Sequence, residues 1–309
     1  MTRLFDHEGE HEKPMAENKT GFQEYLKKEL ENTRGIFVPV KAGFLRRLLV
    51  RRIACKKLHP NPEDEFCSPT VGPNSKIISK YSQDFRRFGT HSSVEYVIEP
   101  LTVEKIRPGG YLILNGHHRW AAAIMTGQRS LPVQIVDLPM EEDIRRMLRQ
   151  SRNDRRVTLD LDEVVFRNEG DGPVEKLPFF LRLRYKQRLR LGIPALFRFF
   201  NKKGYDIWVY SANYYSFKHI QALFMLYNTR VTGIVTGTAR KRRSSAAARD
   251  RLKSSISEHY PTTIHIDAGG VLRVDSQNRD YEEYPLNETG AQWSREIMDL
   301  IEALDKNQH

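Results

Sequence analysis

Two aspartates, Asp160 and Asp162, stand two residues apart at the end of the apolar segment VTLDLD. In a strand, side chains two residues apart point to the same side, and open α/β sheets hold ligands beyond the carboxyl ends of their strands. One carboxylate of such a pair can attack phosphorus and form an aspartyl-phosphate. The other can protonate the leaving oxygen and then activate water. The pair predicts phosphoryl transfer assisted by Mg²⁺, which would offset the charge repulsion between carboxylate and phosphate.

Three other residues follow this pair in an order that suits the same chemistry. Ser211 ends the apolar segment YDIWVYSA, where a hydroxyl can bind a phosphate oxygen. Lys241 follows GIVTGTAR and can neutralise a phosphorylated intermediate. Asp267 ends the third apolar segment, TTIHID, and can help to hold a metal. We therefore expect a catalytic set of Asp160, Asp162, Ser211 and Lys241, and a metal-binding set of Asp160, Asp162 and Asp267.

The segments DLDEVV, VYSAN, the lysine of GTARK, and HID resemble the four motifs of the haloacid dehalogenase (HAD) superfamily. The resemblance covers about residues 155–305. It implies a Rossmann-like core, dependence on Mg²⁺ and phosphatase activity. It assigns the roles of nucleophile, acid/base, motif-two hydroxyl, motif-three cation and motif-four acid to Asp160, Asp162, Ser211, Lys241 and Asp267 in that order.

The sequence departs from this pattern in two places. Motif four has a second acid soon after the first, whereas here Ala268-Gly269-Gly270 follows Asp267 and the next carboxylate is Asp275. A weakened or lost hydrolase activity is therefore an open alternative. Lys241 lies in the basic run RKRR with Lys253 nearby, so either lysine is a candidate for motif three.

A second group of residues, Gly116-His117-His118-Arg119, stands between the predicted strand YLILN and a helix. The N-terminus of a helix binds anions through its unpaired backbone N–H groups and its dipole. Arg119 can hold phosphate through two hydrogen bonds, and Gly116 lets the backbone approach a ligand closely. We expect this turn to bind the phosphates of a nucleotide.

The segments RRIACKKLHPNPEDEF, LILNGHHRWAAA and PVQIV resemble the ParB/sulfiredoxin-like fold over about residues 45–138. In that fold a GxxR turn binds nucleotide phosphates. Sulfiredoxins carry a reactive cysteine where this chain has His117, so sulfiredoxin activity is not expected. The GHHR turn also resembles that of free serine kinases, which carry an acidic residue after the first strand as base. This resemblance implies an ATP- or ADP-dependent kinase, with Glu65 or Glu63 as the base that deprotonates a hydroxyl.

The pattern of apolar segments predicts an α/β protein with two domains. We expect an N-terminal helical extension over 1–44, the smaller α+β ParB/sulfiredoxin-like domain over 45–138, a helical connector over 139–156, and an HAD-like hydrolase domain over 157–309. In the last domain, alternating strands and helices predict a mostly parallel, Rossmann-like sheet covered on both faces.

Composition narrows the partners but does not select one. The 309-residue chain has a formal net charge of +11 and a sequence pI near 9.6, which favours anionic partners such as phosphorylated metabolites, nucleotides or nucleic acid. We expect no membrane span, because no apolar run approaches the roughly 18 residues required. Cys55 and Cys67 show neither a disulfide nor a zinc spacing, so a reducing cytoplasm is expected.

These patterns favour a two-domain enzyme, in which a Mg²⁺-dependent phosphohydrolase is fused to a nucleotide-binding, kinase-like domain. The alternative is a nucleic-acid-binding or regulatory protein built on a degenerate hydrolase scaffold. That alternative is supported by the lack of a second acid close to Asp267 in motif four and by two arginine-rich segments, RLRYKQRLRLG and ARKRRSSAAARDRLK. A nucleic-acid end-processing enzyme would combine the two. The sequence leaves the substrate, the nucleotide and the oligomeric state open.

Overall fold

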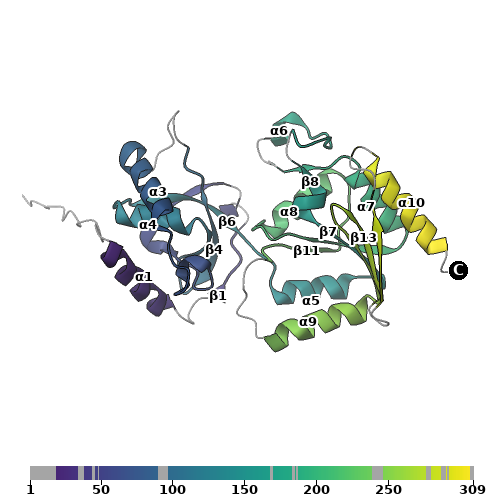
Figure 1. Ribbon diagram of the computed structural model, residues 1–309, viewed down its shortest axis with the longest axis horizontal. Helices are drawn as coiled ribbons and strands as arrows, with labels where there is room; N and C mark the ends of the chain where they lie inside the picture. Colours follow the sequence, from purple (N-terminus) through teal and green to yellow (C-terminus); the bar gives the residue numbers. More distant parts are fainter. Residues whose placement is uncertain are drawn as a thin grey trace, which may run out of the picture. The chain divides into compact units, whose positions relative to one another are not determined.

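The computed structural model divides the chain into two compact units, unit 1 over residues 1–137 and unit 2 over residues 138–309 (Figure 1). The residues that the structure describes are 19–33, 38–43, 46–47, 49–89, 97–167, 170–182, 185, 187–238, 246–275, 280–286, 290 and 292–306. Each unit has its own hydrophobic core and its own sheet. The units are therefore described one at a time.

Unit 1 is a mixed sheet with helices packed against it. The strand order is β2-β6-β4-β5-β3, and β1 pairs with the last two residues of β4. The β4–β6 and β3–β5 pairs are parallel, whereas the β2–β6, β4–β5 and β1–β4 pairs are antiparallel. The elements are α1 (Lys19–Thr33), β1 (Val38–Pro39), β2 (Arg51–Ala54), η1 (Cys55–Lys57), β3 (Leu58–His59), η2 (Glu65–Cys67), α3 (Ser75–Phe88), β4 (Leu101–Arg107), β5 (Tyr111–Asn115), α4 (His117–Met125) and β6 (Ser130–Val136).

The segment SKIISKYSQDFRRF forms α3, and the ends of this helix follow from local chemistry. The side chain of Asn74 accepts hydrogen bonds from the backbone N–H groups of Lys76 and Ile77, which have no partner within the helix. Gly89 follows at a φ of 68°, a conformation that suits glycine at a helix end. The predicted strand YLILN is confirmed as β5.

The helix predicted in the N-terminal extension is present as α1, but it belongs to the body of unit 1. Phe22 and Leu26 are 3% and 6% exposed and lie in the same core as Trp120. The Phe22 ring packs edge-on against the rings of Phe66 and Trp120, with centroids 6.4 and 6.1 Å apart. The segment that we expected to be a peripheral extension therefore contributes a helix to the core.

Unit 2 is built on a six-stranded sheet with the order β11-β10-β7-β12-β13-β14. The pairs among β11, β10, β7 and β12 are parallel, and β13 and β14 continue the sheet as antiparallel strands. A separate two-stranded sheet pairs β8 with β9. The strands are β7 (Arg155–Asp160), β8 (Phe166–Arg167), β9 (Arg188–Leu189), β10 (Tyr205–Tyr210), β11 (Gly233–Val235), β12 (Thr262–Ile266), β13 (Gly270–Asp275) and β14 (Asp280–Pro285).

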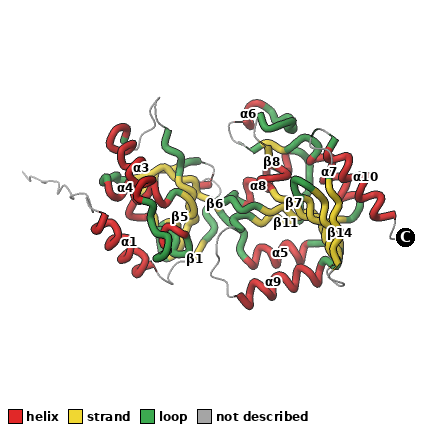
Figure 2. Tube along the Cα trace, viewed as in Figure 1, coloured by secondary structure: helices red, strands yellow, loops and turns green. Residues whose placement is uncertain are grey.

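Helices cover both faces of this sheet, as the alternation of strands and helices predicted. Figure 1 shows α5 and α9 on one side of it and α7, α8 and α10 on the other, and Figure 2 shows the strands between these helices. The helices are α5 (Glu141–Gln150), α6 (Phe179–Arg182), α7 (Ile193–Lys202), α8 (Phe217–Leu226), α9 (Ala246–His259) and α10 (Trp293–Lys306), and a π-helical turn, η3 (Leu161–Val165), follows β7.

The helix expected to be a connector over 139–156 is α5, and it packs within unit 2. Its apolar side, formed by Ile144, Met147 and Leu148, joins a buried cluster with Trp208 and Tyr260. The loop that follows α5 is also fixed, because Asn153 Nδ2 donates to the buried Asp206 carboxylate at 3.0 Å. Tyr260 donates to the same carboxylate at 3.1 Å. The apolar side of the predicted connector is therefore part of the core.

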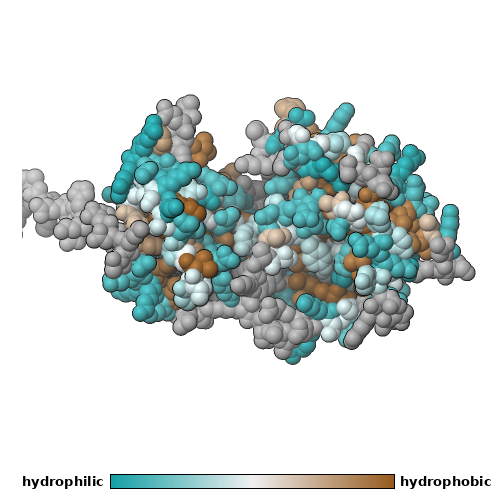
Figure 3. Space-filling model, in the orientation of Figure 1, coloured by the Kyte–Doolittle hydropathy of each residue, from teal (hydrophilic) through white to brown (hydrophobic). Residues whose placement is uncertain are grey.

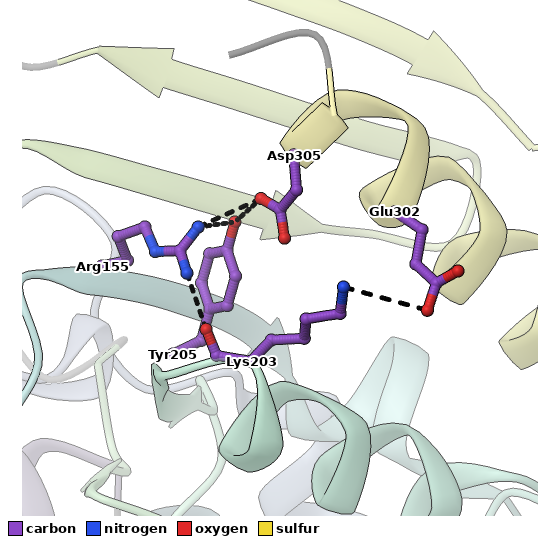
Figure 4. Close-up of polar contacts among 5 residues, drawn as sticks. All are labelled: Arg155, Lys203, Tyr205, Glu302 and Asp305. Carbon is purple, nitrogen blue, oxygen red and sulfur yellow. Dashed lines mark hydrogen bonds and ion pairs between the residues drawn. The ribbon is translucent and has the colours of Figure 1, made fainter. Parts of the chain in front are cut away.

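A polar cluster ties the amino ends of β7 and β10 to α10 (Figure 4). Arg155 Nη1 lies 3.0 Å from Asp305 Oδ1, and Arg155 Nη2 donates to the Lys203 carbonyl at 2.6 Å. The guanidinium lies 4.4 Å from the centre of the Tyr205 ring, and the Tyr205 hydroxyl donates to Asp305 at 3.1 Å. Burial raises the pKa of Tyr205 to about 12, so it remains a donor. This cluster fixes the end of the sheet opposite the aspartates.

The face of the molecule drawn in Figure 3 is mostly hydrophilic, with scattered apolar spots on both units. The exposed large apolar side chains include Phe179 and Phe180 of α6, at 81% and 64% exposure. Within the described parts of the chain, no helix combines the length and the apolar character needed to cross a membrane.

The close packing of β10 against β11 makes Gly233 a sensitive position. A methyl group on Gly233 would overlap the ring of Trp208, which is fully buried and donates to the Tyr260 hydroxyl at 3.0 Å. We predict that Gly233→Ala lowers the free energy of unfolding of unit 2 by about 1–3 kcal/mol, the cost of overpacking. Urea unfolding of the full chain labelled with fluorotryptophan, followed by ¹⁹F NMR at Trp293 in the core of unit 2, would measure this.

Gly269→Ala is the control for this prediction. Its added methyl would meet only Asp267 Oδ1, at 3.8 Å, so its stability should stay within about 0.5 kcal/mol of the wild type. Equal stability of the two variants would show that the Trp208 side chain has room to move.

Candidate functional site

Asp160 is the last residue of β7, a strand with parallel neighbours on both sides. Its Oδ1 accepts hydrogen bonds from the backbone N–H groups of Asp162 and Glu163, at 2.7 and 2.9 Å. These two bonds begin the π-helical turn η3 and hold the carboxylate at the carboxyl edge of the sheet. The expected nucleophile therefore has a fixed position, and its Oδ2 makes no hydrogen bond to the residues that the structure describes.

The structure brings together Asp162 and Ser211, two residues of the expected catalytic set. The Ser211 hydroxyl, which is fully buried at the end of β10, donates to Asp162 Oδ2 at 2.6 Å. The Tyr215 hydroxyl donates to Asp162 Oδ1 at 2.7 Å. Burial and then the hydrogen bond to Asp162 raise the pKa of Tyr215 above its usual value, so this hydroxyl stays protonated. Both oxygens of the Asp162 carboxylate are thus oriented by hydroxyl groups.

Backbone hydrogen bonds join the loop after β10 to the loop after β11. Ser211 N donates to the Val235 carbonyl at 3.0 Å, and Gly237 N donates to the Asn213 carbonyl at 2.8 Å. The Thr238 hydroxyl donates to the Ser211 carbonyl at 3.1 Å. The bonded groups lie at or just after the ends of the neighbouring strands β10 and β11. The position of Ser211 therefore does not depend on a bound ligand.

A cavity of about 460 Å³ opens beside Asp162. The short β8–β9 sheet and the segment leading into β9 contribute Phe166, Arg167 and Gln187 to its wall, and the loop after β10 contributes Asn213 and Tyr215. Arg167 Nη1 donates to the Asp171 carbonyl at 2.9 Å, while its buried Nε has no hydrogen-bond partner among the described residues. Three acids line the cavity, Asp162, Glu163 and Asp171, together with the Tyr215 hydroxyl and the amides of Gln187 and Asn213. Arg167 is the cation among these lining residues and can contact an anionic ligand.

Asp267 follows β12, whose Ile266 lies beside Leu159 of β7, so Asp267 and Asp160 end adjacent strands about 4.8 Å apart. Oδ1 of Asp267 accepts from Gly269 N and Gly270 N at 2.8 and 2.7 Å, which closes the turn between β12 and β13. In both Asp160 and Asp267, one carboxylate oxygen therefore accepts hydrogen bonds from the backbone of the turn that follows the residue.

The residues present suit Mg²⁺ in a limited way. Among the described residues, no cluster of three or more His, Cys, Asp or Glu side chains could hold a metal. Mg²⁺ nevertheless binds through one or two carboxylates, with waters and substrate phosphate completing its shell, and the carboxylates of Asp160 and Asp267 match that requirement. The metal set of Asp160, Asp162 and Asp267 stays a prediction.

Lys241, the expected motif-three cation, lies outside the described residues. The other candidate, Lys253, is an exposed residue of α9. The choice between them therefore stays a prediction.

In unit 1, the GHHR turn lies at the start of α4. Gly116 precedes the helix at a φ of 101°, and no side chain caps the first turn. A methyl group on Gly116 would lie 2.8 Å from the Leu101 side chain and 3.1 Å from Arg119 Nη2. The turn therefore needs glycine and leaves backbone N–H groups of the helix N-terminus without a side-chain partner, which suits an anion.

The two histidines of this turn have structural partners. His117 Nε2 accepts from Asn61 N, and His118 Nε2 accepts from Asn74 N, both at 3.1 Å. Burial lowers the pKa of His117 to about 4, and it lowers the pKa of His118. Two neutral imidazoles thus hold the loop over residues 60–74 against α4, and any phosphate would be bound by backbone N–H groups rather than by imidazolium.

Arg119 is 5% exposed, and its Nη1 lies 2.9 Å from Glu99 Oε2 and also donates to the Glu99 carbonyl. Because the Glu99 side chain is 78% exposed, a phosphate could displace it from Arg119. The cavity at this turn, about 310 Å³, is lined by Asn115, the four GHHR residues and Asp64, together with Ile77, Tyr81 and Leu114.

The acid at this cavity is Asp64. Glu65, the expected base, is an exposed residue of η2 and is not among the lining residues, and neither is Glu63. Asp64 Oδ1 accepts from Phe66 N at 3.0 Å and lies 3.6 Å from His117 Nδ1. The role of Glu65 stays a prediction, and the structure adds Asp64 as a candidate for the same role.

Several residues of these two cavities have no distinctive signal in the sequence. Tyr215 lies in the polar run SANYYS, where spacing does not indicate which hydroxyl faces Asp162. Arg167 and Gln187 are distant in sequence and reach one cavity only through the pairing of β8 with β9. Asp64 lies in an acidic run of three residues, and only the fold of the loop distinguishes it from Glu63 and Glu65.

Comparison with known proteins identifies a ParB-like part of the chain. Residues 89–152 match the ParB N-terminal domain. Because this match covers less than half of the chain, it characterises that part alone. The match overlaps the expected ParB-like domain over residues 89–138 and extends beyond unit 1 across α5 of unit 2. No curated protein matches the chain.

Three solved structures are similar over part of the chain. Structures of C-terminally truncated chromosome-partitioning protein ParB from Caulobacter crescentus, complexed to the centromeric parS site and with CTP-gamma-S, share 23% and 22% identity and have TM-scores of 0.23 and 0.24. The matches cover 33% and 34% of this chain and 51% and 56% of theirs, so this chain spans about half of their length. The C-terminal domain of coenzyme A biosynthesis bifunctional protein CoaBC is 12% identical, with a TM-score of 0.18, over 51% of this chain and 98% of that one.

The neutral state of His117 predicts how the stability of unit 1 depends on pH. The unfolded imidazole protonates near pH 6.5 and the folded one near pH 4, so between these values the unfolded chain binds more protons. Stability should therefore be fully present above pH 6.5 and fall towards pH 4, by roughly 3 kcal/mol at most. Replacement by His117→Gln, which keeps a side-chain acceptor, should flatten this dependence.

The measurement is urea unfolding of the full chain labelled with fluorotryptophan, followed by ¹⁹F NMR. The chain has three tryptophans, of which Trp120 lies in the core of unit 1 and Trp208 and Trp293 lie in that of unit 2, so Trp120 reports on unit 1 alone. An equally steep loss of stability in His117→Gln would assign the effect to other groups.

Proposed function

We propose that this chain is a phosphate-handling protein in which unit 2 hydrolyses a phosphoester and unit 1 binds a nucleotide. The observation that carries the hydrolase part is the cluster of Asp160, Asp162 and Ser211 at the carboxyl edge of adjacent parallel strands, beside a cavity of about 460 Å³. Residues far apart in the sequence thus meet at the place where this class of sheet holds its ligands.

In this proposal Asp160 attacks the phosphorus atom of a bound phosphoester. The bond from phosphorus to the leaving oxygen breaks as an aspartyl-phosphate forms. Asp162, oriented by Ser211 and Tyr215, gives a proton to the leaving oxygen and later takes one from the attacking water. Water then releases phosphate and restores the Asp160 carboxylate. Asn213 and Arg167 bind the substrate in the cavity.

Mg²⁺ bound by Asp160 and Asp267 would offset the repulsion between carboxylate and phosphate. The proposal extends the HAD-like resemblance of the sequence. It is supported by the parallel part of the sheet, β11-β10-β7-β12, in which Asp160 ends β7. The cation Lys241 belongs to the proposal on sequence alone.

The nucleotide-binding part of the proposal is supported by the GHHR turn. A helix N-terminus without a side-chain cap, a glycine required by its conformation and a cavity beside Arg119 form a site suited to phosphate. The match of residues 89–152 to the ParB N-terminal domain supports the same part. Kinase activity towards a small molecule would require a base, for which Asp64 is better placed than Glu65.

The family match also favours a second candidate, a nucleic-acid-binding or regulatory protein on a degenerate hydrolase scaffold. The structural observation in its favour is that Asp267 Oδ1 accepts hydrogen bonds from Gly269 N and Gly270 N within a tight turn. The sequence of this turn, Asp267-Ala268-Gly269-Gly270, contains no second acid. In this candidate unit 1 binds a nucleotide as a regulatory ligand and unit 2 is inactive. The first prediction below separates the two candidates.

We predict that the full chain hydrolyses p-nitrophenyl phosphate or a nucleotide in the presence of Mg²⁺, and that Asp160→Asn lowers kcat by at least about 100-fold, because an amide is not a nucleophile towards phosphorus. Phosphate release would be measured. Asp299→Asn, which removes an exposed carboxylate of α10, is the control and should keep wild-type activity. If neither the wild type nor the control turns over any of these substrates, unit 2 is inactive and the second candidate holds.

We predict that Gly116→Ala weakens nucleotide binding by at least about tenfold, because the methyl group would strain the turn and narrow the approach to the N–H groups of α4. Isothermal titration calorimetry with ATP, ADP and CTP would measure it. Gly43→Ala is the control, since nothing lies within 4 Å of its added methyl. Unchanged affinity in Gly116→Ala would place the nucleotide elsewhere.

A further inference from the structure

Unit 1 contains a strongly basic cavity that the functions above do not use. This cavity, called the basic hollow below, has a volume of about 570 Å³. Cationic side chains from three segments line it, and no acidic residue does. They are Lys41 after β1, Lys56 and Lys57 of η1, and Lys105 and Arg107 of β4, with His59 beside them.

Four of these cations form no ion pair with the part of the chain that the structure describes. Among the described residues, Lys56, Lys57, Lys105 and Arg107 take part in no ion pair, whereas other arginines of unit 1 do. Arg47, for example, lies 3.2 Å from Asp137 Oδ2. Glu29 Oε1 lies 2.6 Å from His59 Nδ1, so His59 has an acidic partner. The four lysine and arginine side chains repel one another, so an anion bound in the hollow would be stabilised.

The backbone fixes the segments that carry these cations. Val40 N donates to the Lys105 carbonyl at 2.9 Å, and Ile106 N donates to the Gly110 carbonyl at 3.2 Å. Gly110 has a φ of 94°, and a methyl group there would lie 2.5 Å from His59 Nε2 and 2.8 Å from the Lys57 carbonyl. The turn between β4 and β5 is therefore packed tightly against β3 and η1, and the hollow is part of the folded structure.

The basic hollow is separate from the GHHR cavity. The two cavities share no lining residue. In Figure 1, β1, which precedes Lys41, lies at the lower edge of unit 1, away from α3 and α4. A ligand at one of these sites therefore leaves the other accessible.

We propose that the basic hollow binds the phosphate backbone of a nucleic acid without reading its sequence. Lysine and arginine side chains supply the contacts that dominate non-specific nucleic-acid affinity. The residues that line the hollow include no Asn, Gln, Asp or Glu, the side chains that most often discriminate base edges besides arginine. Lys56, Lys57 and Arg107 are exposed, as contact with an extended polymer requires.

This inference deepens the second candidate function by locating its nucleic-acid contact, and it does not depend on hydrolysis at Asp160. The net charge of +11 attracts polyanions at long range, but it does not favour one surface of the protein over another. The experiment must therefore compare equal losses of charge at two places in unit 1.

The test uses the full chain and fluorescein-labelled 20-nucleotide single strands and duplexes of DNA and RNA, with binding measured by fluorescence anisotropy across salt concentrations. We expect Lys56→Ala/Lys57→Ala to bind at least about tenfold more weakly at low salt. The slope of log K against log salt should fall in magnitude by about 1–2, because each phosphate contact contributes 0.7–0.9. Asp160→Asn should bind like the wild type, which separates this result from that of the hydrolase proposal.

The matched control is Lys27→Ala/Lys28→Ala, which removes the same charge from the exposed side of α1. It should change the affinity by less than about threefold. An equal loss in both double variants would show that net charge alone causes binding and would overturn the proposal. So would a wild type that binds none of the oligonucleotides, or one that binds only tripolyphosphate, which would make the hollow a site for small anions.

Discussion

The constraint on which unit 2 depends is the pairing of β7 on both of its edges. Parallel hydrogen bonds to β10 and β12 leave this strand no freedom of register, and all of its interior positions are apolar or hydrogen-bonded. Its amino end is held by Arg155 against Asp305 and Tyr205. Its last residue, Asp160, must therefore stand at the carboxyl edge, next to the ends of the two strands that deliver Ser211 and Asp267.

Much of this arrangement is readable from the sequence, because buried parallel strands are apolar runs with an abrupt polar end. VTLDLD, YDIWVYSA and TTIHID each have that form, and the structure brings their ends to one edge. The antiparallel extension by β13 and β14 was not predicted. GVLRVD and DYEEYP alternate too weakly to be recognised as strands, and the pairing of β13 with β12 follows from the turn that Asp267 closes.

Unit 1 shows where reading by residue type is insufficient. The GHHR turn stands at a helix start as predicted, but its histidines are occupied with the backbone of Asn61 and Asn74. A sequence indicates which groups are able to bind a ligand, not which ones the fold has already used. The same limit applies to α1, whose Phe22 enters the core, and to β4, whose mixed sequence LTVEKIR takes a central place in the sheet.

One strand of unit 1 serves as a link between its two cavities. β5 begins at Tyr111, which lines the basic hollow, and ends at Asn115, which lines the GHHR cavity. Four residue steps of a strand span about 13 Å, which exceeds the screening length of about 8 Å at physiological ionic strength. Charge bound at one end is thus largely screened at the other. Communication between the two sites would have to travel as a mechanical displacement along β5, from the Gly110 turn to the first turn of α4.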